Sequence, residues 1–133
     1  MHVKSWGPAD LKAEPAYNTS AVRIFPWDGV PEPVWGGAWV AVEPGETVTP
    51  HAHDEKEMFF IVAGTGVMRI GTERREVGFG DTIFITPDAN HDLTNTGTGP
   101  LLFLGIWWDG TESAPASAPE SAPAADRERV AAP

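Results

Sequence analysis

Cysteine is absent from this 133-residue sequence, which excludes a disulfide framework and a thiolate metal site. Basic residues are scarce, because 9 Lys and Arg stand against 19 Asp and Glu for a formal net charge of −10. Nucleic-acid phosphates require clustered Lys and Arg, so a nucleic-acid partner is not expected. No apolar run approaches the roughly 18 residues of a membrane helix, and Met1 to Asp10 lacks the apolar core of a secretory signal. We therefore expect a cytoplasmic protein, away from membranes, that is held together by packing.

Short apolar stretches separated by Gly, Pro, Asn and Asp recur from Val22 to Trp108. Val, Ile, Phe and Trp suit a pleated strand, and the intervening residues supply turn geometry. Helix is expected only as a turn near Pro8 to Lys12. The fold class is therefore all-β, as a sandwich, a jelly roll or a closed barrel. The predicted strands are Ala21–Phe25, Trp35–Val42, Glu57–Val62, Val67–Ile70, Arg74–Val77, Thr82–Ile85, Asp92–Asn95 and Leu101–Trp108.

Composition divides the chain into three parts. Residues 1–20 are expected to form an N-terminal arm and residues 21–110 a single barrel domain. Residues 111–133 are rich in Ser, Ala and Pro, which cannot bury enough apolar area to offset chain entropy. We interpret them as a disordered C-terminal tail or a linker. Arg127 to Pro133 becomes apolar again, as at the start of a further domain.

Two groups of strand residues have more than one interpretation. The segment Leu101–Trp108 is apolar on both faces, so it is covered on both sides or contributes to a homodimer contact. The side chain of Arg69 is expected to face solvent. Five strand aromatics are expected in the core rather than in a substrate pocket: Phe59, Phe84, Phe103, Trp39 and Trp107.

Three of the four histidines stand in a pattern with one glutamate. Residues two apart on a strand share a face, so His51 and His53 can point inward together, and a hairpin can fold Glu57 back against them. Only a closed or sandwiched sheet would bring His91 near. Imidazole nitrogens and a carboxylate oxygen suit a divalent transition metal. Burying these groups without a metal or partners would cost several kcal/mol, so the pattern predicts a metal site.

The spacing around the first two histidines resembles the first motif of the cupin superfamily. That motif is Gly, five residues, His-x-His, three or four residues, Glu, six residues and Gly, and it is matched in full from Gly45 to Gly64. We expect these glycines, together with Gly80, in tight turns that need a positive φ or a close backbone approach.

The second cupin motif is matched by Gly80, His91 and Asn95, with two departures. Its Pro falls one place late, at Pro87, and its Gly is replaced by Asp88. Asp tolerates left-handed backbone conformations, so we expect the turn to persist. Asn95 is expected to secure a strand by hydrogen bonding.

The resemblance covers residues 20 to 108 and implies a small jelly-roll β-barrel of six to eight strands. It also implies one metal ion held by His51, His53, Glu57 and His91. Zinc is the first choice, and iron, manganese and nickel are the alternatives. No catalytic residue is assigned by the resemblance.

Three classes of function remain open. The first is a metal-dependent enzyme acting on a small molecule, such as a dioxygenase, isomerase, cyclase or lyase, which the intact ligand set favours. The second is a non-catalytic module that binds a small molecule or regulates an effector. The third is a structural or storage cupin, which has no need to keep all the ligands.

One narrower resemblance is to the N-terminal cupin of hydrazine-forming proteins. It rests on the run Glu57 to Gly71, on the ending Gly105 to Trp108, and on the linker that leads to Arg129 to Pro133. In that family a methionyl-tRNA-synthetase-like domain follows the cupin. The resemblance implies that the cupin, typically with zinc, rearranges an amino-acyl ester of an N-hydroxylated amine to form an N–N bond. It also implies a fused synthetase-like domain C-terminal to Pro133.

Overall fold

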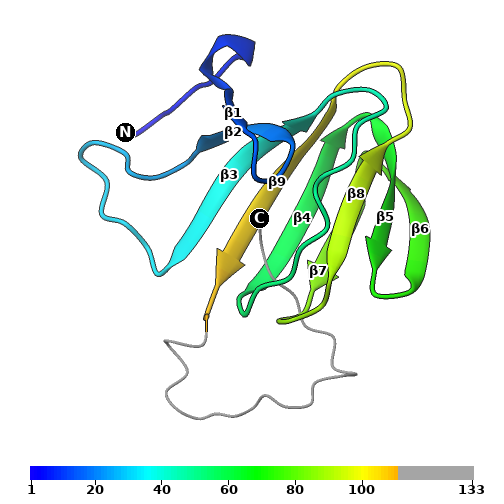
Figure 1. Ribbon diagram of the computed structural model, residues 1–133. Helices are drawn as coiled ribbons and strands as arrows, with labels where there is room; N and C mark the ends of the chain where they lie inside the picture. Colours follow the sequence, from blue (N-terminus) through cyan, green and yellow to red (C-terminus); the bar gives the residue numbers. More distant parts are fainter. Residues whose placement is uncertain (111–133) are drawn as a thin grey trace.

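The computed structural model describes residues 1–110, which form two antiparallel β-sheets with the core between them (Figure 1). A 3-10 turn, Pro8–Asp10, precedes the strands, at the place where the sequence predicted a helical turn. The strands are β1 (Lys12–Glu14), β2 (Thr19–Arg23), β3 (Trp35–Val42), β4 (Lys56–Ala63), β5 (Thr65–Ile70), β6 (Glu73–Gly78), β7 (Thr82–Ile85), β8 (His91–Asn95) and β9 (Leu101–Trp108).

The six-stranded sheet has the order β1-β2-β3-β9-β4-β7, and the second sheet has the order β6-β5-β8. The last strand of the chain, β9, lies in the middle of the larger sheet, between β3 and β4 (Figure 1). Every strand pair is antiparallel. The all-β jelly-roll prediction is therefore confirmed, although the nine strands of residues 1–110 exceed the expected six to eight.

The predicted strands all exist, and three of them, β3, β7 and β9, have the predicted bounds. The unexpected strand is β1, which pairs with β2 in a register that places Lys12 opposite Ala21. Alternating Lys, Ala and Glu carries no apolar signal, so β1 forms because β2 offers it an edge to pair with. Part of the segment that we interpreted as an arm, residues 1–20, therefore belongs to the larger sheet.

A further extended segment, residues 45–51, lies beside β8 and widens the smaller sheet. Isolated bridges join Thr47 to Thr94 and His51 to His91. The two threonine hydroxyls also share a hydrogen bond of 2.8 Å. This segment therefore places His51, the first predicted metal ligand, opposite His91, the last one.

Inward-facing residues of both sheets form one apolar core. The rings of Phe59 and Phe103 are 4.2 Å apart and buried, as the sequence predicted. Trp107 is partly buried against the same core. The prediction for Phe84 was wrong, because β7 is an edge strand and the ring, 49% exposed, lies on its outer face.

Turn geometry follows the sequence at the expected positions. The φ angles of Gly45, Gly64 and Gly80 are +81°, +89° and +91°. At Gly64 a Cβ atom would also lie 2.7 Å from the carbonyl oxygen of Pro100, so glycine is required there on two counts. The tail predicted over residues 111–133 lies outside the described residues. Within residues 1–110, no helix has the length and apolar character needed to cross a membrane.

Candidate metal centre

His51 and His91 face each other across the ladder between the extended segment and β8. The backbone N–H of His51 donates to the carbonyl oxygen of His91 at 3.1 Å, and the reverse bond measures 2.9 Å. Residues directly opposite on antiparallel strands send their side chains to the same face. The two imidazole rings accordingly lie with their centroids 4.4 Å apart. One pair of backbone hydrogen bonds thus brings together two histidines that are forty residues apart in the sequence.

His53 lies in the loop before β4, and the turn at Asp88 fixes its backbone. The N–H of Asp88 donates to the carbonyl oxygen of His53 at 2.6 Å. Asp88 has a φ of +69°, the left-handed conformation expected where the resembling motif has glycine. The replacement of glycine by Asp88 therefore preserves the turn.

Glu57 stands at the start of β4 and is 0% exposed. Its Oε1 atom lies 3.4 Å from Nε2 of His53 and 3.5 Å from Nε2 of His91. The metal-ligating nitrogens of His51, His53 and His91 all lie within 4.8 Å of one another, and together they form a group that could hold a metal ion. The structure therefore brings all four predicted ligands together.

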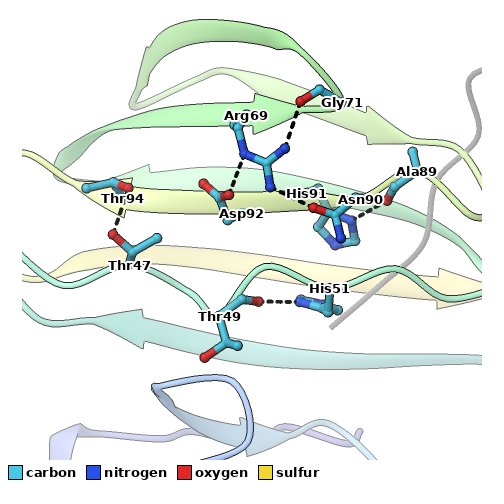
Figure 2. A network of polar contacts seen from close by, with 10 residues as sticks. All are labelled: Thr47, Thr49, His51, Arg69, Gly71, Ala89, Asn90, His91, Asp92 and Thr94. Atoms are coloured by element: carbon cyan, nitrogen blue, oxygen red, sulfur yellow. Dashed lines mark hydrogen bonds and ion pairs between the residues drawn. The ribbon is translucent and has the colours of Figure 1, made fainter.

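Two main-chain carbonyls set the orientation of two of the imidazoles. Nδ1 of His51 lies 2.6 Å from the carbonyl oxygen of Thr49, and Nδ1 of His91 lies 2.8 Å from that of Ala89 (Figure 2). In both cases the acceptor is two residues before the histidine. A neutral ring that donates from Nδ1 leaves the lone pair on Nε2 free to bind a metal. The sequence did not reveal these acceptors, because any residue type supplies a carbonyl.

The chemistry of the donor set fits a cation. Among the described residues, six buried side-chain atoms have no hydrogen-bond partner, and all six belong to the four predicted ligands. Five of these are Nε2 of His51, both ring nitrogens of His53 and both carboxylate oxygens of Glu57; the sixth is Nε2 of His91. Buried polar groups are normally paired, so a cluster of unpaired lone pairs calls for a positive partner.

Burial also controls the protonation of these groups. It lowers the pKa of His53 to about 3, with a smaller contribution from the neighbouring His91 and His51. It lowers the pKa of His91 to about 4 and also lowers that of His51. The imidazoles are therefore neutral near pH 7, which is the form that binds metals. Burial, helped by the nearby Glu55 carboxylate, raises the pKa of Glu57 well above its ordinary value.

Arg69 connects the residues on both sides of His91. Its Nε atom lies 2.6 Å from Oδ2 of Asp92, and its Nη2 donates to the side-chain oxygen of Asn90 at 2.7 Å (Figure 2). A third bond runs from Nη1 to the carbonyl oxygen of Gly71 at 2.7 Å. Arg69 points away from the core, as expected, because the neighbouring Met68 points inward, but it is paired there with the acid opposite it on β8, Asp92. This clamp holds β8 to β5 at the position of the last metal ligand.

Two further residues support the centre. Asn95 donates to the carbonyl oxygens of Val42 and Gly99, both at 2.8 Å, so it secures the strand as predicted. Tyr17 packs its ring 4.8 Å from that of His51, and the N–H of Thr49 donates to its carbonyl oxygen. The sequence did not single out Tyr17, because nothing in residues 1–20 indicated a contact with a histidine that comes 34 residues later.

A cavity of about 400 Å³ lies where the smaller sheet approaches β7. Four residues contribute apolar side chains to its lining, and five contribute polar or charged ones: Met68, Ile70, Val77 and Ile83, and Glu73, Arg74, Arg75, Asp81 and Thr82. Ile70 pairs with His91 across β5 and β8, but none of the four predicted metal ligands lines the cavity. None of the aromatic residues weighed as pocket residues lines it. The volume is within the range of small-molecule sites.

Comparisons with known proteins agree with the fold. A family model described as a cupin domain matches residues 38–107. The solved structure of the plu4264 protein from Photorhabdus luminescens is 31% identical, with a TM-score of 0.76, and the match covers 84% of this chain and 90% of that one. A cupin 2 conserved barrel domain protein from Salinispora arenicola is 26% identical, with a TM-score of 0.76, and the match covers 85% and 92% of the two chains.

A curated relative adds a similarity at the level of sequence. The oxalate-binding protein of Thermotoga maritima is 31% identical over 70 residues, which is 52% of this chain and 58% of that protein. The chain spans about half the length of the curated relatives it matches.

Proposed function

The chain belongs to the cupin family, and on that premise we propose that it is a metal-dependent enzyme acting on a small molecule. One observation carries the proposal: the imidazoles of His51, His53 and His91 and the buried carboxylate of Glu57 converge on one point. Three neutral nitrogens and one carboxylate leave room for a further ligand on most divalent transition metals.

The four side chains would hold the ion, and the structure supports distinct roles for three of them. His51 and His91 present Nε2 because their Nδ1 atoms are engaged by carbonyls. Glu57 supplies the negative charge that a divalent ion needs in a buried site. A bound metal of this kind can polarise a carbonyl, acidify a bound water or, as iron, react with dioxygen. Zinc, which has no redox chemistry, is the ion we favour.

The cavity between the smaller sheet and β7 would provide a place for the substrate. Ile70 lines the cavity and pairs with His91 in the strand ladder, so this residue connects the cavity to the strand that carries the last ligand. Two basic and two acidic residues line the cavity, Arg74 and Arg75 with Glu73 and Asp81, so its formal charge is balanced and would suit a substrate that carries both charged and apolar groups. The orientation of Arg75 follows from its register, because it pairs with the buried, inward-facing Met68.

The specific reaction that we propose is rearrangement of an amino-acyl ester of an N-hydroxylated amine, which forms an N–N bond. Its support is the resemblance of the run from Glu57 to Gly71 and of the C-terminal linker to hydrazine-forming proteins. A redox-inert ion suits this chemistry, since the centre has only to hold two parts of one molecule close together. Reading the gene beyond Pro133 tests the proposal. A methionyl-tRNA-synthetase-like domain would support it, and an unrelated sequence or a stop codon would remove it.

A second candidate is capture of a small dicarboxylate without turnover. It is favoured by the similarity to the oxalate-binding protein of Thermotoga maritima. Calorimetric titration with oxalate separates the two candidates. Binding without consumption of the ligand would favour capture. An iron-loaded protein that consumes oxygen would instead indicate a dioxygenase, and one that converts a ligand to its isomer without oxygen uptake would indicate an isomerase-type cupin.

Metal analysis of the purified protein tests the shared premise. We expect one transition-metal ion per chain, and we expect His51→Ala and His91→Ala to lose it. The matched control is His2→Ala, because His2 lies near Trp27 in the N-terminal segment and outside the ligand cluster. Equal metal content in all three variants would show that the ion is bound elsewhere, and the proposal would fail.

A further inference from the structure

The segment that carries His51, residues 45–51, is extended but is not a regular strand. Isolated bridges at Thr47 and His51 join it to β8, and the N–H of Val48 donates to the carbonyl oxygen of Leu93 in β8 at 2.9 Å. These contacts lie along one edge of the segment. A chain that is held along one edge can turn about that edge, and an imidazole on it would then lose its direction toward the other ligands. The contacts of the opposite edge therefore decide how firmly His51 is held.

The turn between β1 and β2 occupies this opposite edge. The N–H of Thr49 donates to the carbonyl oxygen of Tyr17 at 2.9 Å. Two residues earlier, the carbonyl oxygen of Thr47 accepts a hydrogen bond of 3.0 Å from the side-chain amide of Asn18. The same amide donates to Oε1 of Glu46 at 2.9 Å. The turn therefore binds the segment at alternate residues, as a neighbouring strand would.

The turn is closed by hydrogen bonds of its own. The N–H of Tyr17 donates to the carbonyl oxygen of Glu14 at 3.0 Å, and the N–H of Asn18 donates to that of Pro15 at 3.3 Å. Asn18 has a φ of +59°, in the left-handed region that Asn adopts more readily than most residues. The turn is therefore formed within the β1–β2 hairpin and contacts the segment as one unit.

Tyr17 acts on His51 through its ring and through its main chain. The two ring centroids are 4.8 Å apart, with the rings tilted by 57°, and Tyr17 also packs against the apolar core. The carbonyl oxygen of Tyr17 holds the N–H of Thr49, whose own carbonyl oxygen lies 2.6 Å from Nδ1 of His51 (Figure 2). The ring thus limits the rotation of the imidazole, and the main chain fixes the carbonyl that orients it.

This support comes from outside the part of the chain that the family model matches. Asp88 holds the loop of one predicted ligand, and Arg69 holds the strand of another. Both of these residues lie within the match to the cupin domain, residues 38–107. The turn, residues 15–18, lies outside it. The support of His51 is therefore a contribution of the N-terminal hairpin of this chain.

We propose that Tyr17 is a positioning residue of the metal centre, and that the turn of residues 15–18 fixes His51 in the direction in which its Nε2 binds the ion. The inference rests on the proposed metal site and extends it, because it assigns part of the metal affinity to a segment that supplies no ligand. Nε2 of His51 is buried without a partner. It meets an ion at the centre only while the ring keeps its direction.

The test is the dissociation constant for Zn²⁺ of the full 133-residue chain, measured by competition with a metal-sensitive dye. We expect Tyr17→Ala to raise this constant about ten- to a hundredfold, the usual effect of losing a residue that orients a ligand. Tyr17→Phe should keep the wild-type constant, because the ring and the main chain make the contacts. Asn18→Gly permits the left-handed φ but removes the amide that binds the segment, so it should raise the constant by a smaller factor.

The visible absorption of the cobalt-substituted protein is a readout that a merely structural role would not move. It depends on the number and geometry of the ligands, so Tyr17→Ala should change the spectrum and Tyr17→Phe should not. The matched control is Trp6→Ala. Trp6 is also an aromatic residue of the N-terminal segment, but its ring lies 5.6 Å from that of Trp39, on the outer face of the larger sheet. We expect this control to keep the wild-type affinity and spectrum.

Circular dichroism verifies that each variant is folded. A folded Tyr17→Ala chain with the wild-type dissociation constant overturns the inference, and so does a loss of affinity that Trp6→Ala matches. If Tyr17→Ala does not fold, Asn18→Gly decides in its place, and an unchanged constant there overturns the inference. Failure of the proposed metal site is a different result, because His51→Ala would then keep the metal.

Discussion

Glu57 and Phe59 occupy successive inward positions of β4, yet they belong to two regions with opposite energetics. Phe59 packs on Phe103 in an apolar core, where burial itself supplies the stability. Glu57 and the three imidazoles beside it are buried with unpaired polar atoms, and their burial costs free energy. One strand thus carries both the main source of stability and a cluster that reduces it. The difference indicates that the polar region is retained for binding.

The largest expected effect is in the apolar region. Phe59→Ala removes a fully buried ring and leaves a cavity against Phe103. We expect a loss of about 3–5 kcal/mol in the free energy of unfolding, measured by urea denaturation. A loss below about 1 kcal/mol would show that the core relaxes around the cavity, and the contrast between the regions would weaken.

Bound metal should turn the destabilising contribution of Glu57 and the three histidines into a stabilising one. Adding the bound metal at a hundredfold excess over its dissociation constant should raise the free energy of unfolding by about 2.7 kcal/mol. The effect should vanish in His51→Ala and persist in His2→Ala. Thermal melts with and without a chelator measure it. Equal stabilisation of both variants would place the ion outside the cluster.

Arg69 tests how far the polar region depends on its surroundings. Arg69→Met leaves the buried Asp92 without its ion pair, so we expect a loss of about 1–3 kcal/mol. Because the same side chain holds Asn90 and Asp92 on either side of His91, we also expect weaker metal binding, by about tenfold. Competition with a metal-sensitive dye measures the affinity. Unchanged affinity in a destabilised variant would limit Arg69 to a structural role.

The smallest expected effect is a gain in stability rather than a loss. Glu57→Gln removes an acid whose pKa burial raises well above its ordinary value. Such a group binds its proton more tightly in the folded state than in the unfolded state. The free energy of unfolding therefore falls as the pH rises above the ordinary pKa of glutamate. The metal-free variant should therefore be slightly more stable than the wild type at pH 7, and the gain should disappear toward pH 4. Denaturation at the two pH values checks this, and a less stable variant at pH 7 would contradict it.

The sequence was most informative where a residue type answers a local requirement. Positive φ angles at Gly45, Gly64 and Gly80, the left-handed turn at Asp88 and the anchoring role of Asn95 were all predicted and found. The strand predictions succeeded because apolar runs and turn residues alternate so regularly. Strand β1 was missed, since its residues become a strand only by pairing with β2.

The sequence was least informative about contacts between strands. The outward direction of Arg69 was expected, but its ion pair was not, because Asp92 on β8 and Asn90 just before it meet Arg69 only through the register of β5 and β8. Phe84 was assigned to the core because its strand is apolar, but its position depends on β7 being an edge strand. Tyr17 contacts His51 only because the extended segment, residues 45–51, passes close to the turn between β1 and β2.

The order of residues by itself determined an all-β domain, its turns and the four candidate ligands, because residue chemistry and short spacings are properties of the chain. The tertiary structure decided which atoms of those ligands face one another, which carbonyls orient the imidazoles, and which face of the larger sheet stays exposed. These depend on strand order and register, which arise when the two sheets bury a common core. No local stretch of sequence contains that information.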